Sequence, residues 1–183
     1  MRYLYFIIFI FLIGCSKKEP KPELDYVNID IVPSIGPAPS TIAINFVSKT
    51  ITFTNLLQWA LVPEDLNDSY YKASPKVDFE YIKLNEEEFN QIEKLMNTEF
   101  INFIIKENNE LLKAPDKYYI GIFDGSYFKF DVVKNPQKLI STDYINIIDY
   151  KENCIKTIFN IIHKRTSSKN NKEYITLLYS DIK

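Results

Sequence analysis

The fold is decided by residues 42–54, which have the sequence IAINFVSKTITFT. Large apolar side chains occupy alternate positions on both sides of Ser48-Lys49, which is typical of two strands that each bury one face. A two-residue turn at Ser48-Lys49 would match the apolar faces and leave the threonines outside. The predicted cross-strand pairs are Phe46 with Ile51 and Ile44 with Phe53. The stretch therefore predicts an antiparallel hairpin.

A second hairpin is predicted over residues 118–133, with the sequence YYIGIFDGSYFKFDVV. Asp124-Gly125 favours a tight turn, but a two-residue turn would set apolar side chains opposite charged ones. A three-residue loop over 124–126 matches the apolar faces instead. Its predicted pairs are Ile122 with Phe128, Ile120 with Phe130 and Tyr118 with Val132. The residues then expected on the other face are Tyr119, Phe123, Tyr127, Lys129 and Asp131.

Helical spacing appears in three further stretches. Asn85 and Glu88 have the spacing of a capping box. The apolar stripe that follows them is Phe89, Ile92, Leu95 and Met96. Residues 100–112 predict a second helix, with a strand over 103–105 as the alternative. Another helix is expected to start at Asp149 and to end near 163–165. Its apolar stripe is Cys154, Ile155, Ile158, Phe159 and Ile162.

The overall pattern predicts an α+β fold, because strand pairs are interrupted by helices without regular alternation. We expect an antiparallel sheet built from the hairpins at about 42–55 and 118–133, with two or three helices packed on it. Residues 26–31 alternate as a first strand. Residues 167–172 are expected to form a loop, and residues 174–179 a final strand or short helix. One domain over residues 26–183 fits the hydrophobic content of 46%.

The N-terminus predicts an export signal. Arg2 precedes an unbroken apolar run over residues 3–13. As a helix this run would span roughly 16 Å, which is too short for a bilayer core of about 30 Å. Its length and its flanking residues are those of a secretory signal peptide.

The four residues Leu12-Ile13-Gly14-Cys15 resemble the lipobox of bacterial lipoproteins. The resemblance covers only the start of the chain and implies cleavage before Cys15, with lipid on its thiol and fatty acid, such as palmitate, on the new amine. Residues 1–14 are then the signal peptide, and residues 15–25 a lipidated tether. Ser16 stands where an aspartate would resemble an inner-membrane retention signal, so we expect the outer membrane, with the domain facing the periplasm or the cell surface.

Charge argues against a nucleic-acid partner. Removing residues 1–14 takes away one basic residue and leaves 21 basic and 24 acidic residues, a net charge of −3. Nucleic-acid binding needs a clustered basic face, which this sequence does not indicate.

The residues for common catalytic chemistry are scarce. A zinc site needs three or four Cys or His ligands, and the mature chain offers His163 and, besides the lipidated Cys15, Cys154. His163 and Cys154 are separated by about 13 Å along one predicted helix, too far for a catalytic pair. We expect no enzyme, no cofactor and no metal. A carboxylate-based envelope hydrolase stays an alternative, because paired carboxylates leave no local spacing signal.

Aromatic residues make up 15% of the chain and suggest where a partner binds. One candidate surface is Tyr119, Phe123, Tyr127 and Lys129; a second is Trp59, Tyr70 and Tyr71. The alternative for both is that another element covers them. The sequence thus favours a lipid-anchored, non-catalytic protein-binding module. Its two versions are an immunity-type inhibitor of a toxin and an accessory subunit of an outer-membrane machine.

Overall fold

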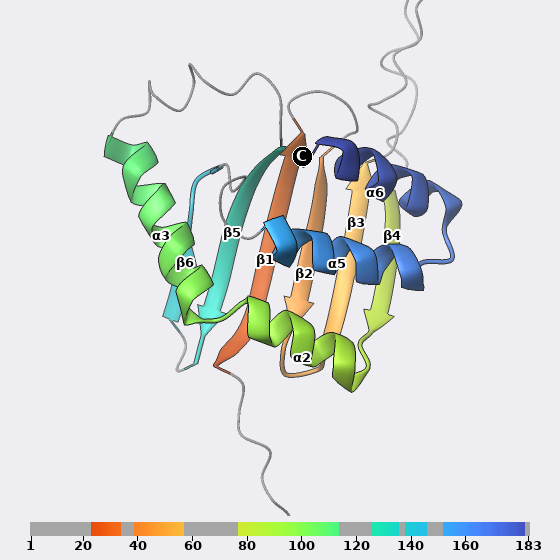
Figure 1. The fold of residues 1–183 in the computed structure, drawn as a ribbon, viewed down its shortest axis with the longest axis horizontal. Coiled ribbons are helices and arrows are strands. Elements are labelled where there is room, and N and C mark those ends of the chain that lie inside the picture. The colour runs from red at the N-terminus through yellow and green to blue at the C-terminus, as the bar shows by residue number, and fades with distance from the viewer. Residues whose placement is uncertain are drawn as a thin grey trace, which may run out of the picture.

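The computed structural model describes residues 23–33, 39–56, 77–113, 126–135, 138–145 and 152–181. These residues form a six-stranded antiparallel sheet and four helices (Figure 1). The strands are β1 (Leu24–Pro33), β2 (Ser40–Asn45), β3 (Thr50–Leu56), β4 (Val77–Lys83), β5 (Ser126–Lys134) and β6 (Lys138–Ser141). The helices are α2 (Glu86–Leu95), α3 (Thr98–Lys113), α5 (Glu152–Arg165) and α6 (Lys169–Asp181). The α+β class is confirmed, with one helix more than the two or three that the sequence predicts.

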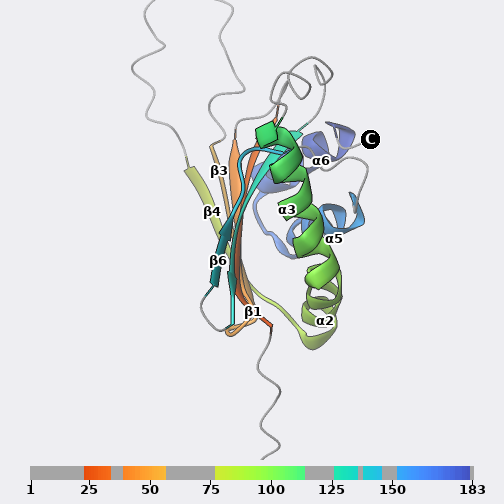
Figure 2. The ribbon, with the colours of Figure 1, turned by 90° about the vertical axis from the view of Figure 1, so that its left-hand side faces the viewer.

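The strands lie in the order β4-β3-β2-β1-β5-β6, and each neighbouring pair is antiparallel. β1, which the alternation over 26–31 predicts, lies between β2 and β5, and its inward residues Val27, Ile29 and Ile31 are fully buried. All four described helices cover the same face of the sheet (Figure 2). The core is therefore a single layer between the sheet and the helices.

The predicted hairpin over 42–55 exists as β2 and β3, but its predicted register is wrong by two residues. Ile44 lies opposite Ile51, and residues 46–49 form a four-residue loop. Lys49 has a φ of 55°, and the Asn45 side chain accepts a hydrogen bond from the Ser48 amide at 2.8 Å. A shift of two residues keeps every side chain on its own face, so alternation alone could not detect it.

The predicted hairpin over 118–133 is wrong. Its first strand lies outside the described residues, while its second strand, β5, is paired on both sides by other segments. Phe128 lies opposite Ile31 of β1 and also bridges to Ile145. Val132 is paired in the same way, with β1 on one side and β6 on the other. Local turn chemistry at Asp124-Gly125 suggested a partner, but the long-range pairing of β1 with β5 occupies that position.

The helix that starts at the predicted capping box is confirmed as α2. Asn85 Oδ1 accepts a hydrogen bond from the Glu88 amide at 2.8 Å, and the Glu88 carboxylate accepts one from the Asn85 amide at 3.0 Å. Its stripe faces the core: Phe89, Ile92 and Met96 are buried. α3 confirms the helical interpretation of residues 100–112, and not the strand.

The stripe of α5 is confirmed, because all five of its predicted residues are fully buried. The expected start at Asp149 lies outside the described residues. The predicted loop over 167–172 is wrong from Lys169 onward, where α6 begins. For residues 174–179 the helical alternative is confirmed.

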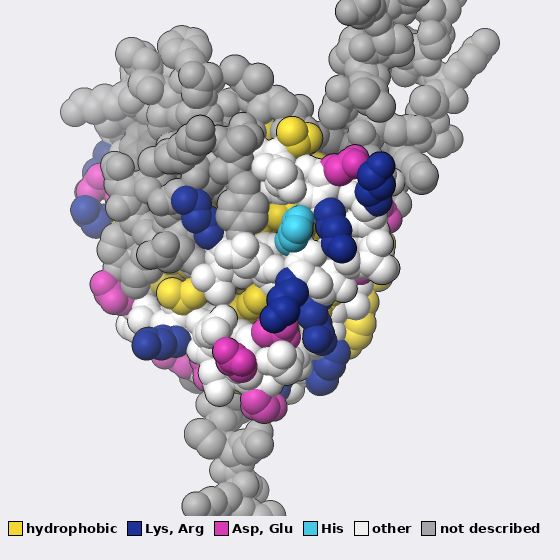
Figure 3. All heavy atoms as spheres, turned by 45° about the vertical axis from the view of Figure 1, so that its right-hand side comes forward, with side chains coloured by type: hydrophobic (Ala, Val, Ile, Leu, Met, Phe, Trp, Pro, Cys, Tyr) yellow, Lys and Arg dark blue, Asp and Glu magenta, His cyan; other side chains and the backbone are white. Residues whose placement is uncertain are grey.

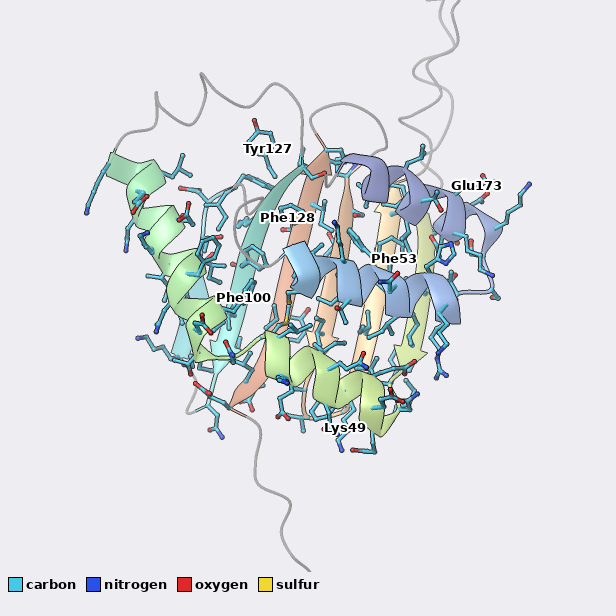
Figure 4. All side chains as sticks on the ribbon, in the orientation of Figure 1. Lys49, Phe53, Phe100, Tyr127, Phe128 and Glu173 are labelled. Atoms are coloured by element: carbon cyan, nitrogen blue, oxygen red, sulfur yellow. The ribbon has the colours of Figure 1, made fainter. Side chains whose placement is uncertain are left out.

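Aromatic side chains fill the layer between sheet and helices. Phe53, Phe100 and Phe128 lie in this layer (Figure 4). The Phe53 ring is centred 5.9 Å from that of Tyr174, and the Phe100 ring 5.5 Å from that of Phe130. These contacts connect α6 and α3 to the sheet.

No helix within the described ranges is long and apolar enough to cross a membrane.

Candidate functional site

The sheet face opposite the helices is the main candidate surface. Among the described residues no helix lies on this side (Figure 2). We call it the outer face. Its residues, from β4 to β6, include Phe79, Tyr81, Thr52, Thr54, Thr41, Ala43, Tyr26, Asn28, Asp30, Tyr127, Lys129, Asp131, Leu139 and Ser141.

The centre of the outer face is polar and internally hydrogen-bonded. Asp30 accepts hydrogen bonds from Asn28 Nδ2 at 3.1 Å and from Thr41 Oγ1 at 2.9 Å. Burial raises the pKa of the Tyr26 phenol, and the charges of Asp30 and Asp131 raise it further. Satisfied short polar side chains of this kind suit a surface in contact with water.

The β4 margin of the outer face is aromatic. Phe79 is 63% exposed and Tyr81 is 62% exposed. In register they lie beside Thr54 and Thr52 of β3, whose small side chains leave both rings standing above the sheet. Two exposed aromatic rings on one edge form an apolar patch next to polar surroundings, which is a common property of protein-binding sites.

Two of the residues that the sequence singles out lie on this face. Tyr127 and Lys129 are half-buried on β5. Their side chains point to the outer face, whereas the buried Phe128 and Phe130 point to the core. Lys129 lies opposite Asp30 of β1. The predicted separation of the two faces of this strand is thus confirmed, although its predicted hairpin partner is wrong.

The other candidate residues, Tyr119, Phe123, Trp59, Tyr70 and Tyr71, lie outside the described residues. So does Cys15.

The strand that carries Phe79 and Tyr81 is not among the elements that the sequence predicts. Residues 78–82, DFEYI, do alternate, and that signal could have identified β4. Alternation would still have assigned the faces wrongly, because it would bury the two rings. The structure turns Asp78 and Glu80 inward instead.

The inward carboxylates of β4 are held by the connection from α5 to α6. Glu80 accepts hydrogen bonds from the Thr166 hydroxyl, from the Ser167 amide at 3.2 Å and from Asn171 Nδ2 at 2.8 Å. Asp78 accepts one from the Ser168 hydroxyl at 2.7 Å. These hydrogen bonds offset the desolvation cost of turning the two carboxylates toward the core. Because buried carboxylates need such donors, the position of the donors determines which face of β4 points outward.

A buried amide pair extends this cluster. Asn171 and Asn55 are both fully buried, and Asn55 Nδ2 donates to Asn171 Oδ1. The cluster therefore connects β3, β4 and α6 by polar contacts at the margin of the core.

Reactive groups lie apart from one another. Cys154 is fully buried in the α5 stripe, and His163 is half-buried in the last turn of that helix. Across the described ranges no three His, Cys, Asp or Glu side chains are grouped to hold a metal ion. The pKa of Glu23 is lowered, because Lys134 and Thr98 hydrogen-bond its carboxylate.

A hollow of about 180 Å³ opens beside Glu23. Its lining residues are Glu23, Leu24, Phe46, Glu93, Met96 and Asn97. Typical small-molecule sites measure about 300–1,000 Å³, so this hollow is smaller than such a site.

No family model, curated protein or solved structure matches the chain.

Proposed function

We propose that this protein is a lipoprotein of the bacterial outer membrane, anchored through Cys15, whose domain binds another protein without catalysing a reaction. The binding surface in this proposal is the outer face of the sheet. The lipobox-like residues Leu12-Ile13-Gly14-Cys15 support the anchor.

One observation carries the binding role: Phe79 and Tyr81 stand exposed, side by side, on a sheet face that no described helix covers. Exposing two large rings forgoes about 1.5–3 kcal/mol for each side chain that could have been buried. On the same strand the polar Asp78 and Glu80 point inward, so the fold leaves the apolar rings and not the carboxylates in contact with water. A partner that covers the rings would recover that free energy on binding.

The identity of the partner distinguishes the two versions of this function. A toxin that arrives in the envelope would make the protein an immunity-type inhibitor, and a membrane barrel or its assembly factor would make it an accessory subunit. The hydrolase alternative requires two facing carboxylates, one of them with a raised pKa.

The test is affinity capture of the full-length protein, with a C-terminal tag, from its native membrane in mild detergent. The double variant Phe79→Ser/Tyr81→Ser is captured beside the wild type, with Leu112→Ser as the control. Leu112 is 61% exposed on α3, on the helix-covered side, so its loss removes a similar apolar side chain elsewhere.

We expect one stoichiometric partner with the wild type and with Leu112→Ser, and a recovery at least about tenfold lower with the double variant. Recovery of the protein alone from the native membrane would contradict the proposed function. The same partner held equally by all three forms would contradict the assignment of the outer face.

A further inference from the structure

β4 is the last strand on its side of the sheet, within the part of the chain that the structure describes. The Leu84 amide donates to the Lys49 carbonyl at 2.9 Å, which fixes the hydrogen-bond pattern between β4 and β3. Ile82, Glu80 and Asp78 therefore turn their main-chain groups toward β3. The main-chain groups of Phe79 and Tyr81 point the other way, because partners in an antiparallel ladder alternate. The exposed rings and the outward backbone groups belong to the same two residues.

One outward group of this edge already has a cationic partner. The Lys83 carbonyl accepts a hydrogen bond from Arg165 Nη2 at 2.9 Å. Arg165 stays 41% exposed, and its Nε lies 3.9 Å from the largely buried Glu88 carboxylate. The Arg165 guanidinium is thus held at one end of the edge, between the Lys83 carbonyl and the Glu88 carboxylate.

Positive charge continues along the flank beside β4. Lys164 is exposed next to Arg165, and Lys169, at the start of α6, is 88% exposed and has its Nζ 3.5 Å from the Glu173 carboxylate. Figure 3 shows Lys and Arg side chains gathered on this flank of the molecule. Asp78 and Glu80, the acidic residues of β4 itself, point inward and are hydrogen-bonded, so they do not project from the edge. In a chain with a net negative charge, exposed basic side chains therefore gather along this flank of β4.

We propose that β4 binds an extended, acidic segment of a protein partner, which adds to the sheet as a strand beside β4. The inference rests on the proposed function and names the kind of partner that it needs. Main-chain hydrogen bonds to Phe79 and Tyr81 supply the pairing, and the two rings contact alternate apolar side chains of the segment. Arg165, Lys164 and Lys169 attract the carboxylates of the segment and select its charge.

Charge also argues against a second copy of this chain as the partner that pairs with β4. Two β4 strands paired antiparallel would bring two sets of Lys164, Arg165 and Lys169 toward the same junction. Like charges brought together oppose that assembly, whereas an acidic segment neutralises them.

The first test uses two labelled seven-residue peptides, matched in length to β4 and acting as probes. One alternates Glu with Val, and the other alternates Lys with Val. Binding to the full chain, purified in mild detergent, is measured by fluorescence anisotropy and by hydrogen exchange of the protein's own amides. We expect the acidic peptide to bind at least about tenfold more tightly than the basic one at low salt, and to slow exchange at Phe79 and Tyr81.

Two variants separate backbone pairing from charge. Tyr81→Pro removes an amide that points away from β3 and should abolish strand addition while leaving the β3–β4 ladder intact. Lys164→Glu/Lys169→Glu alters side chains that are exposed, and should reduce the preference for the acidic peptide at least about tenfold. Unchanged exchange at β4 with the acidic peptide, or equal binding of both peptides, would overturn the inference.

Capture from the native membrane distinguishes this inference from the function on which it rests. A partner that binds the wild type and is lost with Tyr81→Pro supports both. A partner retained by a folded Tyr81→Pro variant overturns strand addition and leaves the binding function in place. The absence of a partner with either form overturns both.

Discussion

Asn171 shows how a single residue fixes the faces of a distant strand. It is fully buried on α6, donates to Glu80 at 2.8 Å and accepts from Asn55. By holding the Glu80 carboxylate inward it contributes to the outward position of the neighbouring rings. Its role depends on partners that lie 91 and 116 residues away in the sequence. Local sequence patterns carry no information on such contacts, which is why the sequence does not predict this cluster.

Asn171→Leu should reduce the free energy of unfolding by about 2–3 kcal/mol. The substitution leaves the Asn55 side-chain amide without its buried acceptor and removes one of the hydrogen bonds to Glu80, and an unpaired buried polar group pays a desolvation penalty. Denaturant unfolding followed by circular dichroism measures the loss. Lys172→Leu, at an exposed position of the same helix, is the matched control and should change stability by less than about 0.5 kcal/mol. Equal stability of the two variants would show that the cluster does not stabilise the fold.

Among the elements, the helices with strong local signals are predicted correctly by the sequence, whereas local turn signals did not predict the strand pairing. The capping box of α2 and the stripes of α2 and α5 depend on residues three or four positions apart, and both are confirmed. Phe128 and Val132 of β5 pair with β1, which lies about a hundred positions earlier in the chain. Local sequence patterns therefore could not predict the pairing of β5. The alternation over residues 78–82 could have identified β4 as a strand, but it would have assigned the faces wrongly, because the apolar rings of β4 face outward.

Asn85→Ala should destabilise the domain by about 1 kcal/mol, because the Glu88 amide loses the acceptor that caps the helix. The measurement is the midpoint of chemical unfolding, compared with that of Asn90→Ala. Asn90 is exposed within α2, where alanine has the higher helix propensity, so the control should be neutral or slightly stabilising. A cap variant as stable as its control would contradict the contribution of the capping box.

At the scale of the whole molecule, one face of the sheet stabilises the fold and the other face is the candidate binding surface. The helix-covered face holds the buried aromatic and aliphatic side chains that stabilise the fold, and the outer face carries Phe79 and Tyr81. The class of the fold and the separation of faces on β5 follow from hydrophobic periodicity. The candidate site follows only in part: Tyr127 and Lys129 were identified from the sequence, whereas the exposed pair on β4 was not.

The proposed anchor gives a prediction for the intact chain. Cells fed an alkyne analogue of palmitate should label the wild-type protein, and Cys15→Ala should remove the label, because the lipid is carried on that residue. Cys154→Ala is the matched control, since Cys154 is buried in the core and should leave labelling unchanged. Label that survives Cys15→Ala would place the lipid elsewhere and contradict the anchor.

The central claim is that the outer face of the sheet contacts a protein in the cell envelope. Its most direct test is photo-crosslinking in living cells, with a photo-reactive phenylalanine analogue in place of Tyr81 or, as the control, of Leu112. Both positions are about equally exposed, at 62% and 61%, but they lie on opposite sides of the sheet. We predict that illumination links position 81 to one protein and position 112 to none. No adduct at position 81, or the same adduct from both positions, would contradict the claim.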